Sequence, residues 1–133
     1  MTKTVETDYI KLELLPSGIL ICTYKRRTII DLAMAKEIVK TRLDFTGPEP
    51  RPVLIYNQGV TEIVKSAREY VSGLEGVAGL NSAAIMRGHA ATAIIMSLII
   101  HLDKPPIPVK FFNKTERALG WLEDFLPHEQ AHS

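Results

Sequence analysis

Few side chains in this sequence have the type and spacing that catalysis or metal binding requires. His89 and His101 are twelve residues apart on one predicted helix, which separates them by about 18 Å along its axis, too far to share a metal ion. His128 and His132 are four residues apart, but no acidic residue or cysteine lies in phase with them. The sequence also lacks a glycine-rich phosphate loop and a hydrolase nucleophile elbow. It therefore predicts no metal, no cofactor and no catalytic residue.

Ser66 is the candidate regulatory residue. With Glu69 three positions later it has the spacing of a capping box, so we expect Ser66 to begin a helix that continues to Tyr70. A phosphate on Ser66 would lie at a helix N-terminus beside Lys65 and Arg68, a favourable place for an anion. Of the two roles, capping and regulation, we favour capping.

Three polar residues are candidates for binding a small ligand. Asn57 follows the short apolar strand predicted over 52–56, and loops after such strands often carry binding residues. Arg87 and His89 lie in a predicted turn before a helix, whose free amides could hold an anion. A solvated turn is the simpler interpretation of residues 87–89.

The predicted helix 90–102 is apolar almost all the way round, with Thr92 and Ser97 as its main polar interruptions. Its length of about 13 residues is too short for a membrane span, which needs about 20. Three interpretations remain open: a homodimer contact, which we favour, burial within one protomer, or a pocket for a lipid-like ligand. The candidate interface residues are Ile94, Ile95, Leu98, Ile99 and Leu102.

The remaining patterns indicate alternating strands and helices. Strands are predicted at about 9–15, 19–24, 52–56, 81–86 and 109–112, and helices at 32–44, 61–70, 90–102 and 113–126. Asp31 is expected to cap the first helix. The order β-β-α-β-α-β-α-β-α predicts one α/β domain over 8–126, with a mostly parallel central sheet of about five strands and helices on its faces. Residues 127–133 are predicted to be a flexible tail.

Composition limits the partners and the compartment. The chain has 133 residues, 46% hydrophobic and 23% charged, with a formal net charge of +1. This length suits one domain, and the balanced charge argues against a nucleic-acid partner. The single cysteine, Cys22, cannot form an intrachain disulfide, and the first residues do not resemble a signal peptide. We therefore expect a cytoplasmic protein.

The sequence resembles a known family over about 8–126. The segments that carry the resemblance are Arg51-Pro-Val-Leu-Ile-Tyr56, Lys65-Ser-Ala-Arg-Glu-Tyr70, Pro108-Val-Lys-Phe-Phe112 and Ala118-Leu-Gly-Trp-Leu122. They resemble small bacterial STAS-like domain proteins, a largely uncharacterised group similar to the stage II protein AA type anti-sigma-factor antagonists of sporulation. The resemblance implies a STAS-like fold and places Ser66 at the antagonists' regulatory serine. Val64, Lys65 and Ala67 stand where that motif has Asp, Ser and Gly.

Two functions follow from these observations. The first is a non-enzymatic regulatory or interaction domain that acts through protein–protein contacts, as a homodimer. The alternative is binding or sensing of a small apolar molecule beside helix 90–102, with the polar end of the molecule at Asn57, Arg87 or His89.

Overall fold

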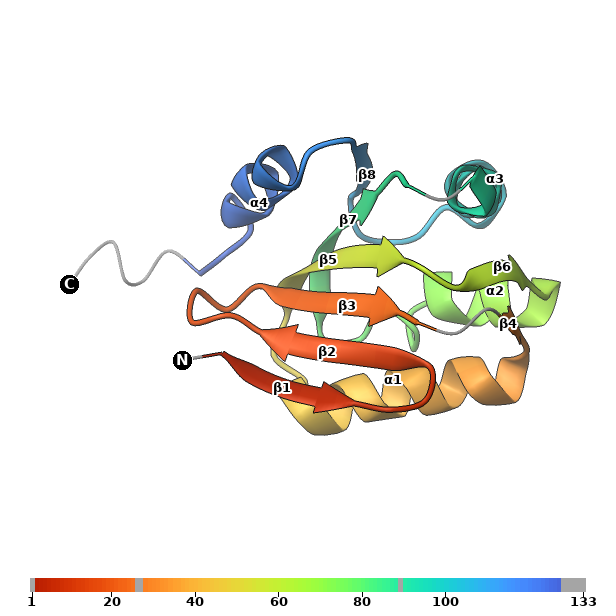
Figure 1. Ribbon diagram of the computed structural model, residues 1–133, viewed down its shortest axis with the longest axis horizontal. Coiled ribbons are helices and arrows are strands. Elements are labelled where there is room, and N and C mark those ends of the chain that lie inside the picture. Colours follow the sequence, from red (N-terminus) through yellow and green to blue (C-terminus); the bar gives the residue numbers. More distant parts are fainter. Residues whose placement is uncertain (1, 26–27, 89, 128–133) are drawn as a thin grey trace.

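The centre of the fold is a mixed β-sheet (Figure 1). The computed structural model describes residues 2–25, 28–88 and 90–127. Within them the sheet has six strands in the order β1-β2-β3-β5-β7-β8. Their bounds are β1 (Lys3–Glu6), β2 (Ile10–Leu14), β3 (Leu20–Tyr24), β5 (Arg51–Asn57), β7 (Leu80–Met86) and β8 (Val109–Phe112). The β1–β2 and β2–β3 pairs are antiparallel, whereas β3, β5, β7 and β8 run parallel to one another. The predicted α/β class is confirmed.

Three strands are absent from the predicted order, and one of them, β1, brings the central sheet to six strands where about five were expected. The strand β1 forms the polar edge of the sheet, and Val5 is its one half-buried residue. The short strands β4 (Thr28–Ile30) and β6 (Val60–Ile63) pair in parallel as a separate two-stranded sheet. β4 has three residues and β1 has one apolar residue, so neither shows a recognisable alternation of apolar and polar side chains.

The first helix begins as the sequence predicts. In α1 (Leu32–Thr46), the Asp31 carboxylate accepts a hydrogen bond from the Met34 amide at 2.9 Å. The later helices are α2 (Lys65–Ser72), α3 (Ala90–Leu98), a π-helical turn η1 (Ile99–Asp103) and α4 (Thr115–Glu123).

The start predicted for α2 was wrong. Its N-cap is Val64, which has extended backbone angles, and Ser66 is the second helical residue instead of the cap. The Val64 amide donates to the Ile30 carbonyl oxygen at 3.0 Å, which continues the β4–β6 pairing to the residue before the helix. Because the strand holds Val64 extended, the helix begins before Ser66 can cap it.

The segment predicted as one helix over 90–102 has two parts. After α3 the turns widen into η1, where the Lys104 amide donates to the Ile99 carbonyl oxygen at 2.8 Å. Lys104 then adopts a left-handed conformation with φ of 48° and ends the helical segment. We call the combined segment, residues 90–103, α3–η1.

Helices cover both faces of the sheet. Side chains alternate along β5, so Val53 belongs to a core shared with α1 and α2, and Leu54 belongs to a second core shared with α4. Figure 1 shows α1 and α4 on opposite sides of the sheet, with α3 beyond β7 and near β6. The larger core, beneath α1, α2 and α3–η1, contains the candidate site.

Two glycines provide a matched test of the packing around α2. A Cβ atom on Gly76 would lie 2.1 Å from the Tyr70 carbonyl oxygen, whereas one on Gly120, in the exposed face of α4, would meet nothing within 4 Å. We expect Gly76→Ala to lower the free energy of unfolding by on the order of 2 kcal/mol, because the backbone at Tyr70 must move away from the added Cβ atom. Gly120→Ala should raise it by about 1 kcal/mol. Urea denaturation measures both, and wild-type stability of Gly76→Ala would contradict the packing described.

Candidate ligand cavity

A cavity of about 170 Å³ lies between the sheet and the helices of the larger core. Its floor is formed by alternate residues of the parallel strands, which all face the same side. These include Cys22, Tyr24, Val53, Ile55, Ala83 and Ile85. The cavity therefore lies over the middle of the sheet.

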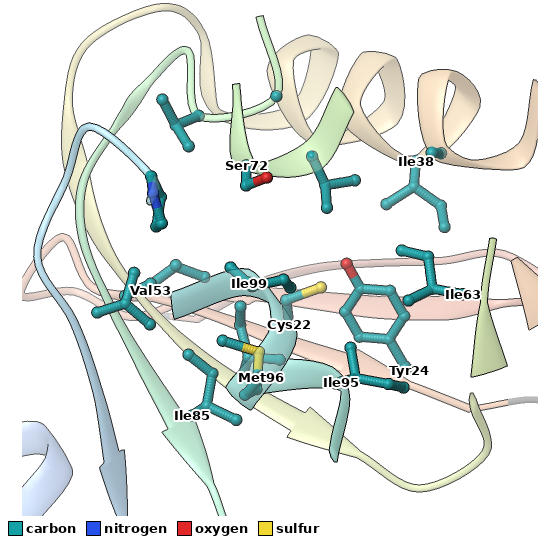
Figure 2. A pocket seen from close by; sticks show the side chains of 18 of the residues that line it. Cys22, Tyr24, Ile38, Val53, Ile63, Ser72, Ile85, Ile95, Met96 and Ile99 are labelled. Atoms are coloured by element: carbon teal, nitrogen blue, oxygen red, sulfur yellow. The ribbon is translucent and has the colours of Figure 1, made fainter. Parts of the chain in front are cut away.

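The walls of the cavity come from several separate segments. They are α1, the end of α2 with the loop after it, the β4–β6 pair and α3–η1. Ile38, Ile63, Ser72, Met96 and Ile99 project from these segments toward the floor (Figure 2). The lining is mostly aliphatic, and an engineered apolar cavity of about 150 Å³ binds benzene. The space is suited to a small apolar molecule.

Asn57 lines the cavity, but its amide group already has protein partners. Its Nδ2 donates to the Val60 carbonyl oxygen at 2.8 Å and to Thr92 Oγ1 at 3.0 Å. Its Oδ1 accepts from the Gly59 and Val60 amides at 3.1 and 2.8 Å. Asn57 thus forms the turn between β5 and β6 and ties it to the start of α3.

Tyr24 brings a polar atom into the apolar space. Figure 2 shows its hydroxyl directed into the cavity, with the Cys22 sulfur near the ring. Within the described residues, no hydrogen bond to this hydroxyl is seen. Burial, and to a smaller extent the neighbouring Cys22, raises the pKa of Tyr24 above its ordinary value. The hydroxyl therefore remains a neutral donor at pH 7.

Cys22 is a buried free thiol on the same face of β3 as Tyr24. Burial raises its pKa to about 12, and the positive charge of Arg42 acts in the opposite direction. Because the thiolate is the reactive form, Cys22 is unsuited to be a nucleophile at neutral pH.

Arg42 is the charged residue in the cavity wall. Only 5% of its surface is exposed, and its guanidinium donates to the Gly76 and Ala78 carbonyl oxygens at 2.8 and 2.7 Å. These two bonds join α1 to the loop before β7. Burial lowers the pKa of Arg42, but an arginine side chain stays protonated in proteins.

A second buried arginine, Arg68, holds the end of α3–η1. Its Nε and Nη2 donate to the two Asp103 carboxylate oxygens at 2.7 and 3.3 Å, and both side chains are at least nine-tenths buried. The hydrogen bond to Asp103 raises the pKa of Arg68. This ion pair fixes η1 against α2.

The candidate regulatory and ligand-binding residues do not come together. Ser66 is exposed on α2 and does not line the cavity. Arg87 is exposed, with its guanidinium 5.1 Å from the centre of the Phe111 ring. His89 lies outside the described residues. Of the predicted ligand-binding residues, the structure therefore places Asn57 at the cavity.

The candidate interface residues divide into two sets on α3–η1, one that lines the cavity and one that is exposed. Ile95 and Ile99 line the cavity. Ile94, Leu98 and Leu102 are 67%, 37% and 65% exposed. The segment thus faces the interior with Ile95 and Ile99, and beside them it carries an exposed apolar stripe, Ile94/Leu98/Leu102.

Sequence reasoning missed Tyr24 and Arg42 as cavity residues, although the signals are present. Arg42 follows Ala35, Ile38 and Val39 at the i, i+3, i+4, i+7 spacing of a buried helix face. Tyr24 has the same parity along β3 as Leu20 and Cys22, which are both buried. Both residues carry a polar group at a position whose spacing matches buried apolar residues, and this feature identifies Arg42 and Tyr24 as candidates.

The part of the chain that the structure describes contains neither a cluster of metal ligands nor a helix that could span a membrane. There, no three histidine, cysteine or acidic side chains gather as they would around a metal ion. Among the described helices, none has the length and apolar character needed to span a bilayer.

Comparison with known proteins gives a fold and a family. The chain is similar to a solved structure of an uncharacterised DUF3478 family protein with a SpoIIAA-like fold from Shewanella loihica PV-4. The TM-score is 0.53 at 15% sequence identity, over 92% of each chain, which shows that the fold is SpoIIAA-like. No curated protein matches the sequence. Residues 13–126 match the family described as Domain of unknown function (DUF7793), and the chain belongs to that family.

Proposed function

We propose that this chain is a non-enzymatic regulatory domain that binds a small apolar molecule in the cavity beneath α3–η1. The observation that carries the proposal is the cavity itself, about 170 Å³ in volume and lined mostly by aliphatic side chains. The SpoIIAA-like fold and the proton-bound state of Cys22 and Tyr24 support a binding role over a catalytic one.

The energetics of packing support an occupied cavity. Protein interiors are close-packed, and an empty space destabilises the fold by about 24 cal/mol per Å³. A cavity of about 170 Å³ corresponds to on the order of 4 kcal/mol. A ligand that fills the space recovers part of this free energy as binding energy.

Toluene binding tests this function with two adjacent residues of α3. Ile95 lines the cavity, whereas Ile94 is 67% exposed. We expect toluene to raise the melting temperature of the wild type and of Ile94→Trp. It should bind Ile95→Trp at least about tenfold more weakly, because the larger ring occupies the cavity. Thermal denaturation and isothermal titration calorimetry measure these effects.

A second variant covers the case in which Ile95→Trp does not fold. Ala83 is 5% exposed on the floor of the cavity, so Ala83→Leu fills the same space from the sheet side. The proposal would be refuted if the wild type did not bind toluene. It would also be refuted if Ile95→Trp and Ala83→Leu both bound toluene as tightly as the wild type does. Native mass spectrometry of the gently purified wild type should also show a bound small molecule as added mass.

A second function, homodimer formation, is favoured by the stripe Ile94/Leu98/Leu102. These residues follow one another at i, i+4 and i+8, so they form one ridge on the outside of α3–η1. A two-fold contact would bring the same ridge of two copies together and remove it from water. We propose a second copy of this chain as the occupant of the stripe.

Sedimentation equilibrium tests the homodimer. We expect a dimer for the wild type and a monomer for the double variant Ile94→Asp/Leu98→Asp, because two carboxylates from each copy would be buried in the contact. Leu74→Asp is the matched control, since Leu74 is 81% exposed on the loop after α2 and is not part of the stripe. Circular dichroism should show both variants folded. A wild type that stays monomeric throughout the concentration range would eliminate this second function.

A further inference from the structure

Arg42 is a buried positive charge in the cavity wall that has no acidic partner within the described residues. Its guanidinium is bonded to the Gly76 and Ala78 carbonyl oxygens, which are neutral dipoles. The neighbouring Tyr24 and Cys22 also line the cavity, and burial raises the pKa of both, so neither carries a negative charge at pH 7. By contrast, Arg68 is bonded to the Asp103 carboxylate.

Buried charges in proteins are normally paired with an opposite charge, because removal of an ion from water is unfavourable. Carbonyl dipoles compensate part of this cost at Arg42, but they leave a net charge of +1 at the edge of an otherwise neutral, apolar space. The guanidinium has five N–H donors, and two hydrogen bonds do not exhaust them. A ligand anion could therefore be recognised by both charge and hydrogen bonding.

The Tyr24 hydroxyl is a second polar group directed into the same space, without a hydrogen-bond partner among the described residues. Both residues line the cavity, Tyr24 from β3 and Arg42 from α1. A phenol hydroxyl donates readily to a carboxylate oxygen. The two residues thus offer one positive charge and one neutral donor to the polar end of a ligand.

We propose that the cavity selects an apolar molecule with a single carboxylate, which is neutralised by Arg42 and hydrogen-bonded by Tyr24. This inference rests on the proposed ligand-binding function and specifies its chemistry. A monoanion matches the single cation of the wall, whereas a phosphate monoester carries about −2 charge and would leave negative charge unpaired. The volume of about 170 Å³ limits the apolar part to a short aliphatic chain or one ring.

Hexanoate and hexanamide test the selection, because they have the same shape and differ in charge. By calorimetry at pH 7, we expect the wild type to bind hexanoate at least about tenfold more tightly than hexanamide, as charged hydrogen bonds are stronger than neutral ones. Arg42→Met should lose this preference while it still binds hexanamide. Tyr24→Phe should weaken hexanoate binding.

Arg51→Met is the matched control for the loss of a guanidinium. The Arg51 side chain also donates to two carbonyl oxygens, those of Gly18 and Thr46, but it does not line the cavity. This variant should keep the wild-type preference for hexanoate. Loss of the preference in Arg51→Met as well would show that it arises from overall charge, and would overturn the role of Arg42.

A measurement on the wild type alone covers the case in which Arg42→Met does not fold. With carboxyl-labelled hexanoate, ¹³C NMR should show a lower carboxyl pKa for the bound acid than for the free acid, because a nearby cation favours the carboxylate. Equal affinity for acid and amide, an unchanged carboxyl pKa, or a preference that persists in Arg42→Met would refute this inference and leave ligand binding intact. If toluene, hexanoate and hexanamide all fail to bind, the proposed function fails as well.

Discussion

The alternation of side chains along the parallel strands is the constraint on which the rest of this structure depends. It directs Val53 and Ile55 to one face of the sheet and Leu54 to the other, so each face needs its own cover. On one face, α4 packs directly with Ala118 and Leu122, which are fully buried. On the other, α1, α2 and α3–η1 converge from different parts of the chain. Where they meet above the sheet they leave the cavity instead of a filled core.

Buried polar contacts hold these converging segments in place. Arg42 reaches residues 34 and 36 positions later, Asn57 reaches Thr92 across 35 positions, and Arg68 reaches Asp103 across 35. Each contact joins a helix or turn to an element far along the chain, so each fixes one side of the cavity. Removal of water from polar groups is unfavourable, and a bonded partner offsets most of that cost. For Arg42 the partners are dipoles only, which distinguishes it from Arg68.

The sequence predicts the regular parts of this fold well and the candidate site poorly, for identifiable physical reasons. The alternation in β2, the apolar run of β5 and the Asp31 cap of α1 are local signals, and the structure contains all three elements. The start of α2 depends instead on the bond from Val64 to Ile30, a contact between distant residues that overrides the local Ser66 and Glu69 pattern. The cavity depends on how three segments meet, which residue periodicity does not encode. In the sequence, Arg42 and Tyr24 can be recognised only as polar residues whose spacing places them among buried neighbours.

The thinness of α3–η1 has a thermodynamic consequence. Ile95 and Ile99 line the cavity, and the neighbouring Leu98 and Leu102 are exposed, so one helical segment about 10 Å across borders both proposed binding surfaces. If ligand binding and self-association both occur, a shift of this segment that accompanies one of them also changes the free energy of the other. Linkage requires the two effects to be equal in free energy: an acid that strengthens self-association by some factor must itself be held more tightly, by the same factor, in the associated form.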